Sequence, residues 1–218
     1  MQGSILTSSR KFENAEDWMY ALGDVPLKRV VMDPWPGTAT EQDVLTFADR
    51  DDRLLELIDG TLVEKPAGWW ESVIATRLAA AVGVFVAARR LGYITGASGP
   101  IRMNGGHVRL PDMAFLSIED LPGRPLPREA IPTLSPTLVA EVLRIGSTEA
   151  EIQQKLRDYF ASGTRLAWIL DPLERTIAIY NKPSDEPTKI LHEFDTFDGG
   201  TVLPGFQLSI AELFSPRP

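Results

Sequence analysis

Residues 138–170 read LVAEVLRIGSTEAEIQQKLRDYFASGTRLAWIL, and this segment alone predicts a fold class. Two compact apolar runs, 138–143 and 166–170, have the length of buried strands. Between them, Thr148 and Glu151 stand at capping-box spacing, and Gly163 ends a helix that runs to about residue 161. A strand, a helix and a second strand of these lengths predict a right-handed parallel crossover, the basic unit of an α/β fold.

The flanking sequence supplies further elements on both sides of this unit. Before it lie a hairpin at Asp59-Gly60, a long apolar helix over about 70–90, and a second hairpin with strands at 100–103 and 108–116. After it lie strands over 176–180 and 189–194. We therefore expect a central mixed β-sheet flanked by helices, with hairpins at the start and end of the domain.

The N-terminal region differs from the rest of the chain. Apolar residues at 15, 18, 19 and 22 recur at helical spacing, so residues 1–37 are expected to form an arm with one short amphipathic helix. Residues 38–218 would form the domain. Its first helix is expected to start near Thr38, with Glu41 as its capping-box partner.

Composition excludes several chemistries. The 218 residues include no cysteine, so disulfides, thiolate zinc sites and cysteine nucleophiles are impossible. The two histidines, His107 and His192, are too few for a histidine-rich metal site, and we expect both to face solvent. The apolar stretch over 78–88 contains Gly83 and is too short to span a bilayer, so a cytoplasmic protein is expected. The net charge of −8 argues against a broad basic surface for nucleic acid.

Three ionisable residues interrupt otherwise apolar segments. Asp112 lies in a strand rich in apolar residues, and Glu141 interrupts the run over 138–143. Lys155 falls at the edge of the buried face of the helix that follows. A buried carboxylate needs a partner, a metal or a raised pKa, so these positions point to a site.

Each residue also has a structural interpretation. Asp112 could close a turn or pair with Arg109, Glu141 could form a salt bridge with an arginine, and Lys155 could extend to water. Glu56 and Glu71, taken singly, suit the surface or a helix start.

Two carboxylates on strands and a lysine that points inward suit a hard divalent cation. Oxygen ligands favour Mg²⁺ or Mn²⁺, which retain water and bind substrate phosphates. Such a metal activates water, and a neighbouring lysine stabilises charge that develops at phosphorus. The pattern therefore favours phosphodiester hydrolysis.

Pro111-Asp112, then Glu141, then a lysine resembles the PD-(D/E)xK nuclease pattern of the restriction-endonuclease-like fold. More narrowly, the chain resembles the Uma-type restriction endonuclease family over roughly residues 38–214. The segments that carry this resemblance are ELIDG at 56–60, RLPD at 109–112, VAEVL at 139–143, KLRDY at 155–159, LPGF at 203–206 and AELF at 211–214.

The resemblance implies roles for single residues. Asp112 and Glu141 would bind the metal, Lys155 would be the catalytic lysine, moved from strand to helix, and Glu56 would be a further acidic residue of the site. Arg109 and Glu71 are candidate substrate-binding residues. Glu71 stands where the family often has histidine, and residues 144–148 read RIGST where a Ser-Pro pair is common.

We therefore expect a Mg²⁺- or Mn²⁺-dependent endonuclease that cleaves DNA as a homodimer, since a twofold axis places one site on each strand. For such an enzyme, replacing Lys155 by alanine should abolish cleavage and leave the fold intact. One alternative is a catalytically inactive module that keeps the nuclease fold and binds nucleic acid or protein. A second alternative is a different phosphoesterase or a structural protein in which Glu141 and Lys155 merely pair with each other.

Overall fold

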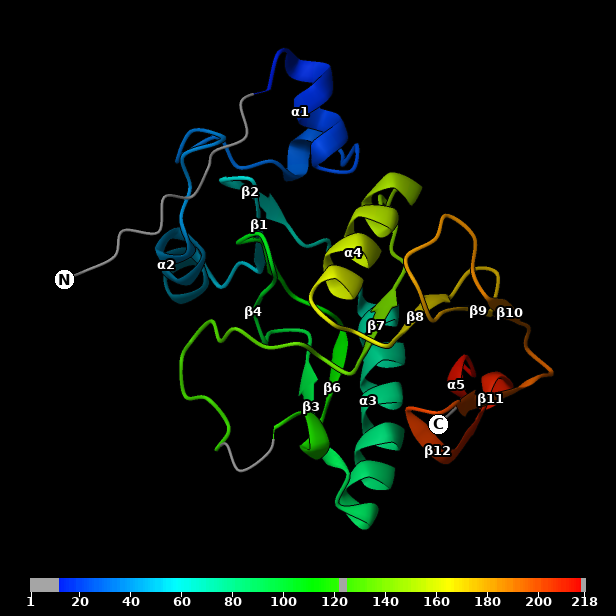
Figure 1. The fold of residues 1–218 in the computed structure, drawn as a ribbon. Helices are drawn as coiled ribbons and strands as arrows, with labels where there is room; N and C mark the ends of the chain where they lie inside the picture. Colours follow the sequence, from blue (N-terminus) through cyan, green and yellow to red (C-terminus); the bar gives the residue numbers. More distant parts are fainter. Residues whose placement is uncertain (1–11, 122–124, 217–218) are drawn as a thin grey trace.

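A computed structural model describes residues 12–121 and 125–216 of the chain (Figure 1). The N-terminal part holds helix α1 (Ala15–Ala21), a 3-10 turn (Leu27–Arg29) and helix α2 (Glu41–Asp51). Helix α2 begins after Thr40, and its capping box is completed by Asp43, not by Thr38 and Glu41 as expected. Residues 1–11 of the predicted arm lie outside the described residues.

A four-stranded antiparallel sheet follows, in the order β2-β1-β5-β4. Its strands are β1 (Leu55–Ile58), β2 (Thr61–Glu64), β4 (Ile101–Arg102) and β5 (Val108–Arg109). The predicted hairpin at Asp59-Gly60 joins β1 to β2, and both turn residues adopt positive φ.

The central sheet has six strands in the order β10-β9-β8-β7-β6-β3. The strands are β3 (Gly92–Gly96), β6 (Met113–Ser117), β7 (Leu138–Val142), β8 (Leu166–Asp171), β9 (Thr176–Tyr180) and β10 (Lys189–Leu191). Strands β7 and β8 are parallel neighbours and are connected by helix α4 (Glu149–Ala161). The other neighbouring strands of this sheet are antiparallel. The predicted crossover and the mixed sheet are both confirmed.

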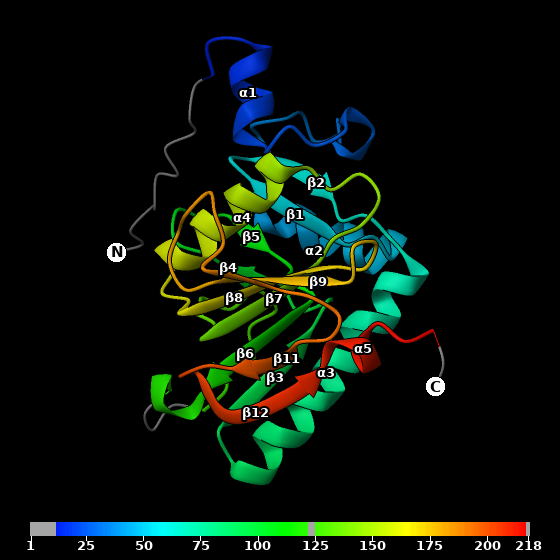
Figure 2. The same cartoon turned by 90° about the vertical axis from the view of Figure 1, so that its right-hand side faces the viewer.

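Different elements cover the two faces of the six-stranded sheet (Figure 2). Helix α4 lies on one face. The other face is covered by helix α3 (Trp69–Arg89), the hairpin of β11 (Thr196–Gly199) and β12 (Leu203–Ser209), and helix α5 (Ile210–Leu213). Trp168 on β8 has no exposed surface and packs against Phe197 and Phe206, which also contacts Phe85 of α3. This side holds the largest apolar core of the described residues.

Helix α3 matches the long apolar helix predicted over about 70–90, but it is long and apolar enough to span a membrane, which the shorter stretch over 78–88 did not indicate. It spans 21 residues, and its most apolar 18-residue window has a mean hydropathy of 1.6; within residues 12–121 and 125–216 it is the helix that meets the length and composition of a membrane span. Its residues Ile74, Leu78, Val82 and Val86 are at most 2% exposed against the six-stranded sheet. This face therefore serves the core of the domain.

The expected strand over 108–116 is in fact two strands in two sheets. β5 ends at Arg109 in the four-stranded sheet, and β6 begins at Met113 in the six-stranded sheet. Pro111 lies between them and has no N–H to donate to a ladder, so the strand is interrupted there. The chain thus passes from one sheet to the other at Leu110-Pro111-Asp112.

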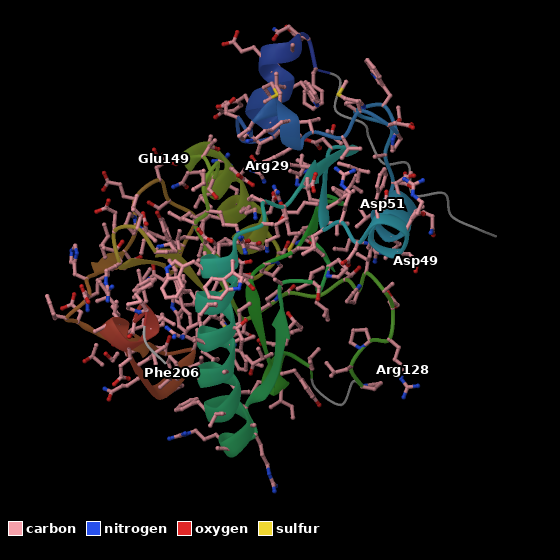
Figure 3. All side chains as sticks on the ribbon, turned by 180° about the vertical axis from the view of Figure 1, so that it is seen from behind. Arg29, Asp49, Asp51, Arg128, Glu149 and Phe206 are labelled. Atoms are coloured by element: carbon pink, nitrogen blue, oxygen red, sulfur yellow. The ribbon has the colours of Figure 1, made fainter. Side chains whose placement is uncertain are left out.

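The N-terminal segment packs on the first hairpin. Val30 forms a bridge with Val63, and Leu22, Val25 and Val30 share an apolar cluster with Ile58 and Val63. Arg29 lies between this segment and the start of α4 (Figure 3), where it forms two hydrogen bonds of 2.7 and 2.8 Å with Glu151. Glu151 therefore ties α4 to the N-terminal segment instead of completing its own capping box.

Candidate active site

Four of the predicted site residues meet where the two sheets come together. Glu56 lies on β1, Asp112 on the link between the sheets, Glu141 on β7 and Lys155 on α4, and each is at most 4% exposed. Lys155 Nζ lies 3.1 Å from Glu56 Oε1 and 3.2 Å from Glu141 Oε1. Lys155 thus reaches inward, as its place on the helix predicted.

Local backbone periodicity brings these side chains together. Glu141 faces away from Ala140 and Val142, because neighbouring side chains of a strand point to opposite sides of the sheet. Lys155 and Tyr159 are four residues apart and share one face of α4. The Tyr159 hydroxyl donates a hydrogen bond to the same Glu141 oxygen that Lys155 contacts.

The carboxylate of Asp112 is held by two cationic side chains and a backbone N–H. Arg144 donates to both of its oxygens, over 2.6 and 3.0 Å, and Lys65 Nζ lies 2.8 Å from Oδ1. The backbone N–H of Val142 donates to Oδ2 over 2.8 Å. Burial raises the pKa of Asp112, but the charge of Lys65 and the hydrogen bonds from Arg144 outweigh it and lower that pKa to about 2.

One structural interpretation of the sequence paired Arg109 with Asp112, but the structure gives Arg109 other partners. It is fully buried and donates to Glu56 over 2.9 Å and to Asp158 over 2.7 Å. Burial raises the pKa of both carboxyls, but neighbouring positive charges outweigh burial and lower each pKa to about 2. The largest of these charges is Lys155 for Glu56 and Arg109 for Asp158. Arg109 therefore lies behind the predicted catalytic residues and holds Glu56 in place.

His107 was expected to face solvent, but the structure places it inside the charged cluster. Its two ring nitrogens lie 3.0 Å from Asp158 and 3.2 Å from Asp59, and its side chain is 14% exposed. Burial lowers the pKa of His107, but the hydrogen bonds to the two aspartates outweigh it and raise that pKa to about 9. The imidazole is therefore a charged part of the cluster at neutral pH.

Burial decides the direction of the pKa shift of Glu141, whereas neighbouring charges decide that of Lys155. Burial raises the pKa of Glu141, although the charge of Lys155 opposes it. Burial lowers the pKa of Lys155, but the charges of Glu141 and Glu56 raise it overall. Lys155 is therefore an ammonium group that stabilises negative charge, and it is too weakly acidic to act as a neutral base.

Glu71 lies apart from this cluster, in the first turn of α3, and is half-buried. It acts on the site through its charge. Burial lowers the pKa of Arg144, but Asp112 raises it overall, with contributions from Glu141 and Glu71. The Glu71 carboxylate thus adds to the negative charge that faces the Arg144 guanidinium.

The sequence analysis missed Lys65, Asp158 and the inward position of Arg144. Asp158 stands three residues after Lys155, so helical spacing could have placed it on the same side of α4. Lys65 directly follows β2, where a lysine is ordinarily a surface residue, and nothing in the sequence marks it as buried. Arg144 was noted as part of an unusual loop, without its contact to Asp112.

The donor chemistry of the site fits Mg²⁺ or Mn²⁺. Mg²⁺ is commonly held by one or two carboxylates, with water and substrate phosphate as its other ligands, and Asp112 and Glu141 supply two such groups. Residues 12–121 and 125–216 contain no cluster of three or more acidic or histidine side chains arranged for a metal. Both oxygens of Asp112 are engaged by cationic side chains, so metal binding requires one of them to withdraw.

Comparison with solved structures supports the fold. A structure described as "a putative nuclease belonging to DUF820" from Anabaena variabilis superposes with a TM-score of 0.65 over 75% of this chain and 90% of that one. The two sequences are 20% identical, so this likeness concerns the fold. No curated protein matches the chain significantly.

The sequence also matches a family model described as "Uma2: Putative restriction endonuclease" over residues 41–211. The match contains Glu56, Asp112, Glu141 and Lys155, together with both sheets that position them. On this evidence the chain belongs to the Uma2 restriction endonuclease family.

Proposed function

We propose that this protein is a divalent-metal-dependent endonuclease that hydrolyses phosphodiester bonds in DNA. The observation that carries the proposal is the meeting of Asp112, Glu141 and Lys155, from three separate elements, in one buried cluster. The fold and the family are consistent with this chemistry.

The residues would divide the work as follows. Asp112 and Glu141 would hold Mg²⁺ or Mn²⁺, which when bound activates water and polarises the phosphate. The Lys155 ammonium would stabilise negative charge that develops on the scissile phosphate. Glu56 would orient Lys155 through their 3.1 Å contact, and Arg109 would in turn fix Glu56.

The test is cleavage of supercoiled plasmid in the presence of Mn²⁺ or Mg²⁺. We expect nicking or linearisation by the wild type and a loss of about a hundredfold or more in Glu141→Gln, since a metal ligand is removed. Gln keeps the shape of the carboxyl and can still accept the hydrogen bond from Tyr159. Glu193→Gln, which changes a half-buried ion pair with Arg175 outside the cluster, is the matched control and should cleave normally.

A second candidate function is a binding module without turnover. The specific observation in its favour is that Arg144 and Lys65 already neutralise Asp112. Equal cleavage by wild type and Glu141→Gln would contradict the role of Glu141 as a metal ligand, and absence of cleavage by the wild type would contradict the endonuclease. Retention of DNA binding in that case would support the module.

We further propose a cytoplasmic homodimer, because two sites related by a twofold axis can cut both strands of a duplex. Light scattering at micromolar concentration should return twice the chain mass of 24.1 kDa. A monomer mass would contradict the dimer without bearing on the chemistry of the single site.

A further inference from the structure

Arg144 occupies the carboxylate that would receive the metal. We propose that Arg144 and the divalent cation bind Asp112 in mutually exclusive states, so that Arg144 sets the metal affinity of the site. This inference rests on the proposed function, because it assumes that Asp112 is a metal ligand.

The geometry of the Arg144 contact leaves Asp112 little capacity for another cation. The guanidinium spans both carboxylate oxygens, over 2.6 and 3.0 Å, in the bidentate arrangement that makes arginine–carboxylate pairs strong. The backbone N–H of Val142 takes a further position on Oδ2. A metal ion at bonding distance from either oxygen would therefore approach the guanidinium nitrogens closely.

The charge balance of the cluster leads to the same conclusion. Four buried carboxylates, those of Glu56, Asp112, Glu141 and Asp158, face four cations. The cations are Lys65, Arg109, Arg144 and Lys155, and the charged His107 is balanced by the further carboxylate of Asp59. A buried charge without a partner is costly, so adding a divalent ion to this balanced set favours the departure of one resident cation.

Arg144 is the resident cation best placed to leave. Arg109 and Lys155 each bridge two carboxylates, and Lys65 also donates to the carbonyl of Leu110. Arg144 lies two residues beyond the end of β7, next to Ile145, which is 98% exposed. The Arg144 side chain is 9% exposed and has one further contact, a 3.4 Å hydrogen bond to the carbonyl of Val142. Clearing Asp112 therefore costs this long hydrogen bond and rotations toward solvent, whereas each of the other three cations would leave a second carboxylate or a buried carbonyl.

The same contacts show that the domain should tolerate loss of Arg144. Without it, Asp112 keeps Lys65 at 2.8 Å and the N–H of Val142. The carboxylate is then still paired and still hydrogen-bonded, so Arg144→Ser should fold. Arg144→Lys provides a second, more conservative variant, which keeps the charge but cannot form the bidentate fork.

The experiment measures the dissociation constant of Mn²⁺ by the electron paramagnetic resonance signal of the free ion, with the purified full chain. We expect Arg144→Ser to bind Mn²⁺ at least about tenfold more tightly than the wild type, and Arg144→Lys to fall between them. Arg165→Ser, which removes an exposed pair with Asp120, is the control and should match the wild type. Adding Asp112→Asn to Arg144→Ser should abolish the gain.

Equal affinities of wild type and Arg144→Ser would overturn the inference and leave the metal-dependent endonuclease standing. A gain that persists with Asp112→Asn would also overturn it, because the competition would then not concern that carboxylate. Absence of Mn²⁺ binding in every variant would overturn the inference and remove the metal from the proposed function as well. Cleavage of plasmid DNA tests the proposed function separately from these affinities.

Discussion

Strand β7 has two buried faces that are stabilised in different ways. Leu138, Ala140 and Val142 point toward α3 and pack with apolar side chains, whereas Val139 and Glu141 point toward α4. All five residues are at most 2% exposed. The α3 face needs only close packing, but Glu141 also needs Lys155 and Tyr159 as partners. Equal burial therefore conceals two different requirements, and substitutions can separate them.

The largest effect is expected on the α3 face. Trp168→Ala removes a side chain that has no exposed surface. Its ring centroid lies 4.3 Å from that of Phe197. We expect a loss of about 3–5 kcal/mol in the free energy of unfolding, because a large cavity forms in a packed core. Urea denaturation followed by circular dichroism measures this loss. A loss below about 1 kcal/mol would show that this face can repack.

A smaller effect is expected on the α4 face. Lys155→Met removes the cation shared by Glu56 and Glu141. We expect a loss of about 2–3 kcal/mol in the free energy of unfolding. The loss stays below that of a buried charge left without any partner, because Arg109 still pairs with Glu56 and Tyr159 still donates to Glu141. Arg157→Met, on the exposed side of the same helix, should stay within about 0.5 kcal/mol of the wild type. Unchanged stability in Lys155→Met would mean that its ion pairs contribute nothing net.

This prediction changes how Lys155 variants are interpreted. From the sequence, Lys155→Ala was expected to abolish cleavage while the fold stayed intact. Because the buried lysine neutralises two carboxylates, both activity and stability should fall together. Glu141→Gln is therefore the cleaner test of the chemistry.

The third effect concerns the outer part of the charged cluster and depends on pH. The pKa of His107 is raised from 6.5 to about 9 in the folded protein, so its contribution to stability is complete below pH 6.5 and is lost as the pH rises through 9. The slope is at most about 1.4 kcal/mol per pH unit for one proton. Thermal unfolding between pH 6 and about pH 9.5 should show a decline that is absent from His107→Asn.

The exposed His192 provides the matched control for this measurement. His192→Asn should retain the decline with pH. If His107→Asn also retained it, the ion pairs of His107 with Asp59 and Asp158 would not be its cause.

Sequence reasoning found the residues that contradict their own local pattern. Glu141 stands in an apolar strand and Lys155 at the edge of a buried helix face, so both were recognisable without a structure. The crossover over 138–170 was predicted for the same reason, since its apolar runs, cap and terminal glycine all agree. Pro111 also carried a readable signal, because a proline within a strand marks a break.

The partners of these residues could not be predicted. Arg109 reaches Glu56 across 53 positions and His107 reaches Asp158 across 51, so no local spacing relates them. Lys65 and Arg144 stand where positive side chains ordinarily face water. Which cation neutralises which buried carboxylate is decided by how the two sheets dock, and that information is not local.

The link at Leu110-Pro111-Asp112 has a consequence for how the domain assembles. Glu56 belongs to one sheet and Glu141 to the other, and Asp112 lies on the three residues that join them. A chain in which only one sheet has formed therefore lacks either Glu56 or Glu141 from the acidic cluster. Contacts between residues far apart in sequence form late, because closing long loops costs entropy. During folding, the constellation proposed for cleavage should therefore arise together with the completed domain, and partly folded molecules should lack the proposed activity.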